Sequence, residues 1–379
     1  MTGTIGLSAV TVSVLAAGLA FGGPAAAQAQ GETVRRAVPA ETTAAAAVNP
    51  DWTPPRTPWG QPDLRGIWTS DDMRSVPFAR PPEMGTRTEL TEAEFEARAA
   101  QDSGALDRAQ NQETFLRNER GIRTFGYTSM IVDPPDGQVP AMTAAGKARI
   151  DPQRDRGTFA PGPFDSVRDD FTLYDRCITR GVIGSILPVL YGNGLRIMQT
   201  PDEVVISYEM IHDTRVIPLD GRPPLDPAIR QYMGASRGHF EGDTLVIETT
   251  NFTDQTSIGG NGNGPRHSAR LHLTERLTRI DPDMIDYRAT IDDPVAYTEP
   301  FTIRLTISTQ PGYEIYEYSC HEGNGAVKYA LSGERAYDKA VAKAKAEGKP
   351  IPDRGVGSGA IGATVYRPPT DEESVDIGR

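Results

Sequence analysis

Four polar residues lie close together in the stretch EMIHDTR, residues 209–215: Glu209, His212, Asp213 and Arg215. A histidine oriented by a carboxylate is a common general base near neutral pH, because the pKa of imidazole lies close to that value. His212 and Asp213 fall at a turn, and Glu209 lies on the expected strand before it. The pattern predicts acid–base chemistry by Glu209, His212 and Asp213. It also fits a hairpin turn in which Asp213 pairs with Arg215.

A second group lies in the stretch YEYSCHEGN, where Cys320 stands directly before His321 and Glu322. Cysteine, histidine and carboxylate in a row could be a nucleophile with its base, a set of metal ligands, or one end of a disulfide beside two polar residues. The only other cysteine is Cys177, and cysteines of exported proteins usually pair. We therefore expect a Cys177–Cys320 disulfide, whereas a reactive thiolate would need a reducing environment. His321 and Glu322 stay catalytic candidates at the end of a strand.

Metal and cofactor chemistry receives little support from the sequence. The two histidine–carboxylate pairs, at His212 and His321, are 109 residues apart and lack the short histidine spacing of common metal sites. There is no G-x-S-x-G, H-E-x-x-H, C-x-x-C or Walker motif. No metal and no cofactor are expected. The side chains expected to contact a small-molecule ligand are Trp68, Tyr208, Arg215, Arg237, Tyr316 and Tyr318.

The N-terminus predicts export. The first 29 residues carry no charge, contain the apolar stretch IGLSAVTVSVLAAGLAFGG, and end in Ala27-Gln28-Ala29. A short apolar core before an A-x-A site is typical of a secretory signal peptide. No Lys or Arg precedes the core, so an N-terminal membrane anchor is the alternative. No later stretch is apolar enough to cross a bilayer, so we expect no transmembrane segment in the mature chain and a periplasmic or secreted location.

Composition narrows the partners and the class of fold. The chain has 39 basic and 51 acidic residues, a net charge of −12, which argues against nucleic acid as a partner. Its 38 glycines and 31 prolines suit a turn-rich β protein with long loops better than a helical bundle.

Alternating apolar and polar residues predict strands, most clearly at residues 301–308, where the odd-numbered side chains are apolar and the even-numbered ones polar. A capping box at Thr91–Glu94 predicts one helix. The other expected strands are LRGIWTS, LRIMQT, EVVISYEMI, TRVIPL, DTLVIETTNF, ARLHLTERLTRI, DMIDYRATI and GYEIYEYSC, and FGYTSMIVDPPDG is expected to be a strand that runs into a Pro-Pro-Asp-Gly turn.

These elements predict an all-β fold: an antiparallel meander that closes into a calycin- or lipocalin-like barrel and so removes its sheet edges. The expected divisions are a signal peptide (1–29), an Ala/Pro-rich linker (30–63), one β-barrel domain (64–335), and a tail (336–379) that is helical and then disordered. Within the domain, residues 103–182 form a long irregular segment that wraps around it.

Two resemblances support this interpretation. Gly66-Ile67-Trp68 resembles the G-x-W that opens lipocalin and related calycin barrels, which implies a cavity for apolar small molecules. TPWGQPDLRGIW, SMIVDPPDGQVP, EMIHDTRVIPLDGRP, SRGHFEGDTLVIETTNFTD and YEYSCHEGN resemble a broad group of exported bacterial proteins of unknown function. This second resemblance implies export and a shared fold, without an activity.

Three functions stay open on the sequence alone, because one fold can host binding and catalysis. The first is an exported barrel that binds a small apolar or aromatic molecule in its cavity. The second is a cofactor-independent lyase, isomerase or hydrolase that uses His212 with Glu209 or Asp213. The third is a structural protein of the cell envelope without a site.

Overall fold

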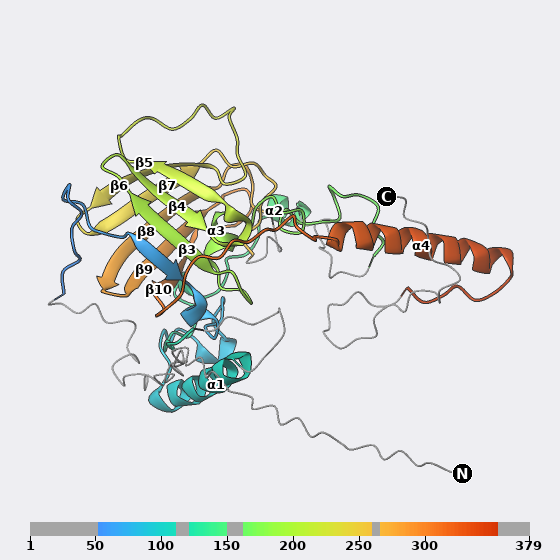
Figure 1. Ribbon diagram of the computed structural model, residues 1–379, viewed down its shortest axis with the longest axis horizontal. Coiled ribbons are helices and arrows are strands. Elements are labelled where there is room, and N and C mark those ends of the chain that lie inside the picture. Colours follow the sequence, from blue (N-terminus) through green and yellow to red (C-terminus); the bar gives the residue numbers. More distant parts are fainter. Residues whose placement is uncertain (1–51, 111–120, 150–161, 260–265, 355–379) are drawn as a thin grey trace, which may run out of the picture. The chain divides into compact units, whose positions relative to one another are not determined.

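A computed structural model describes residues 52–110, 121–149, 162–259 and 266–354 (Figure 1). The predicted signal peptide, most of the predicted linker and the end of the predicted tail lie outside the described residues. Within the described part, no helix is both long and apolar enough to span a bilayer.

Ten strands form one sheet, and every neighbouring pair is antiparallel, which confirms an all-β, meander-like fold (Figure 1). The order is β5-β4-β3-β1-β10-β9-β8-β7-β6, and β2 also pairs with β10. The strands are β1 (Gly66–Thr69), β2 (Ile131–Asp133), β3 (Gly194–Gln199), β4 (Glu203–Tyr208), β5 (Thr214–Pro218), β6 (Ala235–Glu241), β7 (Thr244–Thr250), β8 (His272–Asp281), β9 (Met284–Asp292) and β10 (Phe301–Ser308).

The predicted closed barrel is wrong, because the sheet stays open between β5 and β6. Nine strands lie on the path of antiparallel neighbours, so the two end strands run in the same direction and cannot form the antiparallel ladder found everywhere else. Side chains span this gap instead: Nη2 of Arg215 on β5 donates to Oγ of Ser236 on β6 at 2.9 Å.

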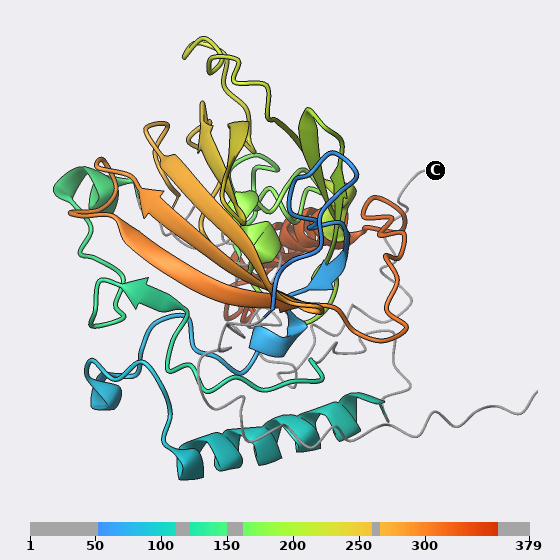
Figure 2. The same cartoon turned by 90° about the vertical axis from the view of Figure 1, so that its left-hand side faces the viewer.

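The inner face of the sheet is an apolar core, and the short helix α3 (Val182–Ile186) packs against it (Figure 2). Alternate residues of β9 are buried along its length, and β10 shows the predicted alternation from Phe301 to Leu305. The predicted solvated face is wrong at Thr306 and Ser308, which are buried and hydrogen-bond to Tyr127 and Asp72. Val182, Ile183 and Ile186 of α3 belong to the same cluster of buried side chains.

The helices agree with the sequence in part. Helix α1 (Glu92–Gln110) starts at the predicted capping box, where the main-chain N–H of Thr91 donates to Glu94 at 2.8 Å. Helix α2 (Ala144–Ala148) and the 3-10 turns Asp71–Met73, Pro82–Met84 and Met210–His212 are short. Helix α4 (Ala326–Ala346) begins ten residues before the boundary expected at 336.

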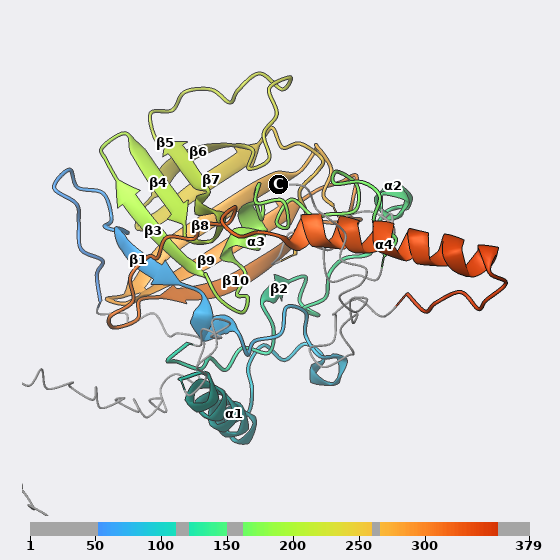
Figure 3. The same cartoon turned by 45° about the vertical axis from the view of Figure 1, so that its right-hand side comes forward.

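The strand expected at GYEIYEYSC is wrong, since residues 313–319 have no regular secondary structure. The preceding strand, β10, lies between β1 and β9 and therefore has no free edge beside which a following strand could pair. Residues 310–320, which we call the strap, instead lead from the end of β10 toward α4 (Figure 3).

Candidate functional site

The turn between β4 and β5 has an unusual backbone. Ile211 and His212 have φ values of 69° and 50°, in the left-handed region that side chains other than glycine rarely adopt. A β-branched residue such as isoleucine is an outlier there, and backbone strain of this kind is common at functional sites. The turn leaves Glu209 buried and His212 exposed.

The Glu209 carboxylate lies beneath the strap. Its Oε2 accepts a hydrogen bond from the Tyr313 hydroxyl at 2.7 Å and one from the main-chain N–H of Tyr316 at 3.4 Å. Burial raises the pKa of Glu209, the two hydrogen bonds oppose that rise, and the charge of Asp71 adds to it. Glu209 is thus a buried acid, and the hydrogen bonds that stabilise its ionised form come from uncharged donors.

Glycine at position 194 makes this arrangement possible. A Cβ there would lie 2.8 Å from Glu209 Oε2 and 2.6 Å from the Tyr313 hydroxyl oxygen, too close for any side chain. The next residue, Leu195, faces the core, so position 194 faces the opposite side of the sheet. Glu209 therefore lies on the outer face of the sheet.

A second buried acid, Asp71, lies just after β1. The side-chain amide of Asn193 donates to its Oδ1 at 2.6 Å, and the Thr69 hydroxyl donates to its Oδ2 at 2.8 Å. Burial raises the pKa of Asp71, the hydrogen bonds from Asn193 and Thr69 oppose that rise, and the charge of Asp72 adds to it. Asp71 and Glu209 together form what we call the acid pair, in which the charge of Asp71 disfavours the charged form of Glu209.

Among the described residues, neither the Asp213 carboxylate nor the His212 ring hydrogen-bonds to the side chains of the acid pair. The Thr179 hydroxyl donates to the half-buried Asp213 carboxylate, and burial raises the pKa of Asp213. The ring of His212 is exposed, and the hydrogen bond between His212 and Glu209 joins main-chain atoms at 3.2 Å. The structure therefore brings neither Glu209 nor Asp213 to the His212 ring by a hydrogen bond.

The disulfide predicted between Cys177 and Cys320 is confirmed, with an S–S distance of 2.11 Å. Near it, the Tyr318 hydroxyl lies 3.4 Å from that of Tyr174, and its ring stacks with Tyr191 at a centroid distance of 6.3 Å. His321 and Glu322 follow the disulfide and are exposed, as is Tyr316.

Tyr208 and Arg215, two residues predicted to contact a ligand, are joined in a buried network on the inner face. Arg215 donates from Nη1 and Nη2 to the two carboxylate oxygens of Glu275, at 3.0 and 2.6 Å. Nη1 also donates to the Tyr208 hydroxyl at 3.2 Å. We call this the Arg215 network, and its other members are Ser236, Thr249 and Tyr287.

The remaining two predicted ligand contacts also have partners within the protein. Trp68 is buried, and its indole N–H donates to the carbonyl of Leu64 at 3.0 Å. Arg237 is half-buried and donates to the carbonyl of Pro223.

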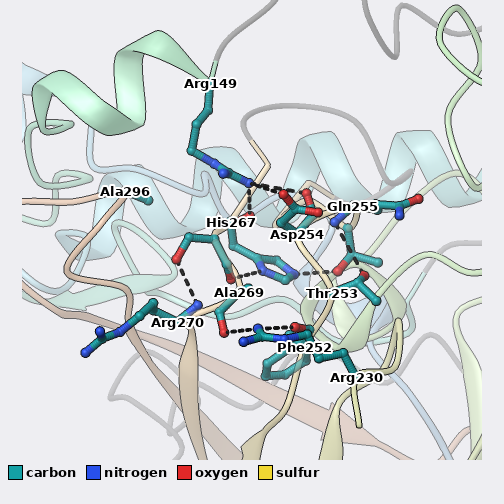
Figure 4. A network of polar contacts seen from close by, with 12 residues as sticks. Arg149, Arg230, Phe252, Thr253, Asp254, Gln255, His267, Ala269, Arg270 and Ala296 are labelled. Carbon is teal, nitrogen blue, oxygen red and sulfur yellow. Dashed lines mark hydrogen bonds and ion pairs between the residues drawn. The ribbon is translucent and has the colours of Figure 1, made fainter. Parts of the chain in front are cut away.

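A buried histidine that carried no functional signal in the sequence lies in a further polar network (Figure 4). The Nδ1–H of His267 donates to the carbonyl of Ser268 at 3.0 Å, so Nε2 accepts a hydrogen bond from the Thr256 hydroxyl. Burial lowers the pKa of His267. Nη2 of Arg149 donates to the His267 carbonyl at 3.1 Å and lies 3.5 Å from the Asp254 carboxylate. The neutral imidazole is thereby fixed in one tautomer.

Among the described residues, no group of three or more histidine, cysteine, aspartate and glutamate side chains is arranged to hold a metal ion. Comparisons with protein-family models, with curated proteins and with solved structures found no match for this chain.

Proposed function

We propose that this chain is an exported protein that binds a small molecule at the acid pair and exchanges a proton with it through the Glu209 carboxyl. The observation that carries the proposal is the environment of Glu209. A buried carboxyl whose pKa is raised by burial and by a second acid is suited to general acid–base work closer to neutral pH. The strained turn at Ile211 and His212, which fixes Glu209, supports the same assignment.

The chemistry fits isomerisation, elimination or hydrolysis without a cofactor. Tyr313 donates to Glu209 now, and its hydroxyl is placed to donate to a bound molecule once Glu209 has taken up a proton. We therefore assign the acid–base function to Glu209, assisted by Tyr313 and Asp71, and not to the exposed His212.

A periplasmic or secreted location belongs to the same proposal. The Cys177–Cys320 disulfide supports it, because disulfides persist in oxidising compartments.

Binding of an apolar or aromatic molecule on the inner face stays a prediction. The inner-face residues pack with α3 and with one another, so such a ligand would have to displace that helix.

The test compares the protein purified from the periplasm with Glu209→Gln and with the matched control Glu314→Gln, which changes an exposed acid on the strap. Small molecules that copurify are identified by untargeted mass spectrometry, and the proteins are then incubated in D₂O. We expect the wild type and Glu314→Gln to copurify with the same enriched molecule. That molecule should gain solvent deuterium at carbon with these two proteins and not with Glu209→Gln. Equal enrichment and equal deuterium on Glu209→Gln would overturn the proposal.

A further inference from the structure

The strap reaches the acid pair without being part of the sheet. In the part of the chain that the structure describes, no β-ladder joins residues 313–319 to a strand. Two of its main-chain hydrogen bonds are local, from Tyr313 to Gln310 at 3.1 Å and from Cys320 to Tyr318 at 2.8 Å. A segment that lacks a ladder can leave the surface without breaking the sheet.

The strap contacts the protein beneath it at two places. The Tyr313 hydroxyl and the Tyr316 N–H donate to Glu209, and Tyr318 lies against Tyr174 and stacks with Tyr191. The segment that covers Glu209 therefore also supplies the hydrogen bonds to its carboxylate. Glu209 keeps only 5% of its surface exposed.

The disulfide fixes the far end of the strap. Cys320 is bonded to Cys177, on a segment 143 residues earlier in the chain. The near end is fixed by β10, which lies inside the sheet. With both ends held, the strap stays close to Glu209 even when its hydrogen bonds break, because closing a short tethered loop costs little entropy.

We propose that the strap is a cover over Glu209 that opens seldom while the Cys177–Cys320 disulfide is intact and opens more often when a dithiol reduces that bond. A thiolate of the reductant attacks one sulfur and forms a mixed disulfide, and the second thiol of the reductant then displaces the protein sulfur. The reductant leaves as a disulfide, and Cys177 and Cys320 each end as a thiol. The far end of the strap is then held only through the residues that follow it, where the Asn324 side-chain amide donates to the Asp175 carbonyl at 3.1 Å. The acid pair opens more often to solvent and to a ligand.

The inference rests on the proposed role of Glu209, but its test needs no ligand. Carboxyl groups are labelled with a water-soluble carbodiimide and glycine ethyl ester, and the labelled peptides are quantified by mass spectrometry. The oxidised protein is compared with the protein treated with dithiothreitol and with Cys177→Ser/Cys320→Ser. Glu314 and Glu317 on the strap are exposed and report full labelling, while the buried Glu275 reports the integrity of the sheet.

We expect labelling of Glu209 to rise at least about tenfold on reduction, which corresponds to about 1.4 kcal/mol of easier opening. The double variant should show the same labelling without reductant and no further change with it, and Glu275 should stay protected throughout. Unchanged labelling of Glu209 would overturn the proposal. A joint rise at Glu209 and Glu275 would also overturn it, because the bond would then hold the whole fold and not the strap. A failed search for a bound molecule would leave these labelling results unaffected, so the two proposals fail separately.

Discussion

The two faces of the sheet bury charge in opposite ways. On the inner face, the Arg215 network sets one guanidinium against one carboxylate, and neutral hydroxyls supply the remaining hydrogen bonds. On the outer face, the acid pair sets two carboxyls near each other, and each receives hydrogen bonds from neutral donors. The inner network is balanced in charge, and the outer pair changes its charge as protons bind.

This difference indicates different roles. A buried ion pair is costly to break, so the Arg215 network holds β5 against β6, β7 and β8. The raised pKa values of Glu209 and Asp71 bring proton uptake toward the range in which proteins work. The molecule thus has one region for holding the open sheet curled and another for exchanging protons.

The largest loss of stability is expected for Glu275→Gln. The change leaves the Arg215 charge buried and unpaired, so we expect the free energy of unfolding to fall by about 3–5 kcal/mol. Urea unfolding followed by circular dichroism measures the effect. The double variant Arg215→Met/Glu275→Leu should recover most of the loss, because it buries no charge. A loss below about 1 kcal/mol in Glu275→Gln would show that the network does not hold the sheet.

A matched pair of tyrosine variants compares the two regions directly. Tyr287 donates to Glu275 at 3.0 Å, and Tyr313 donates to Glu209 at 2.7 Å. Tyr287→Phe should cost about 1.5–3 kcal/mol, since its acceptor is charged and buried. Tyr313→Phe should cost about 1 kcal/mol or less below the pKa of Glu209, where the acceptor is neutral. Urea unfolding over a pH series measures both losses, and a loss for Tyr313→Phe that equals that of Tyr287→Phe at every pH would contradict the distinction.

The sequence predicts the local features of this molecule better than the contacts between distant segments. The alternation at residues 301–308 and the capping box at Thr91 predict local structure, because each depends on neighbours in the chain. The disulfide was predictable from the export signal expected at the N-terminus together with the presence of two cysteines. Glu209 is identified from its place beside a turn, but its partners Tyr313 and Asp71 are 104 and 138 residues away and give no local signal.

Failed predictions have the same origin. The closed barrel fails because the direction of β5 relative to β6 depends on the order of all nine strands along the path. The strand expected in the strap fails because β10 has no free edge, which only the full strand order reveals. The Arg215 network gives no local signal either, because Glu275 lies 60 residues from Arg215 in the chain. The ligand contact predicted for Arg215 stays a prediction.

The dependence of stability on pH tests whether Glu209 titrates in the folded protein. The folded-state pKa of Glu209 is above its ordinary value of 4.5, so the folded protein binds more protons than the unfolded chain in that window. Its stabilising effect is complete below the ordinary pKa and is lost as pH rises through the folded-state pKa, by about 1.4 kcal/mol for each unit of difference. Glu209→Gln should therefore become more stable relative to the wild type between pH 4.5 and pH 8, as urea unfolding at each pH will show.

The control for this series is Glu241→Gln. Hydrogen bonds from Arg276 and His239 lower the pKa of the exposed Glu241, so its variant should change in the opposite direction and weakly. A Glu209→Gln curve parallel to the wild type at every pH would mean that Glu209 does not titrate in the folded protein.

The smallest effect is expected for Arg276→Gln, which removes an Arg–Glu pair of the same chemistry as the one in the Arg215 network. Arg276 lies 2.8 Å from Glu241, and the two side chains are 43% and 50% exposed. Water solvates both charges after the change, so we expect a loss of about 1 kcal/mol or less in urea unfolding. If Arg276→Gln and Glu275→Gln lose the same free energy of unfolding, the loss at the Arg215 network comes from breaking an Arg–Glu pair and not from its burial. A several-fold larger loss for Glu275→Gln means that burial accounts for the difference. Burial also raises the pKa of Glu209 and Asp71, so the same property makes the Arg215 network a fixed support and lets the acid pair respond to protons.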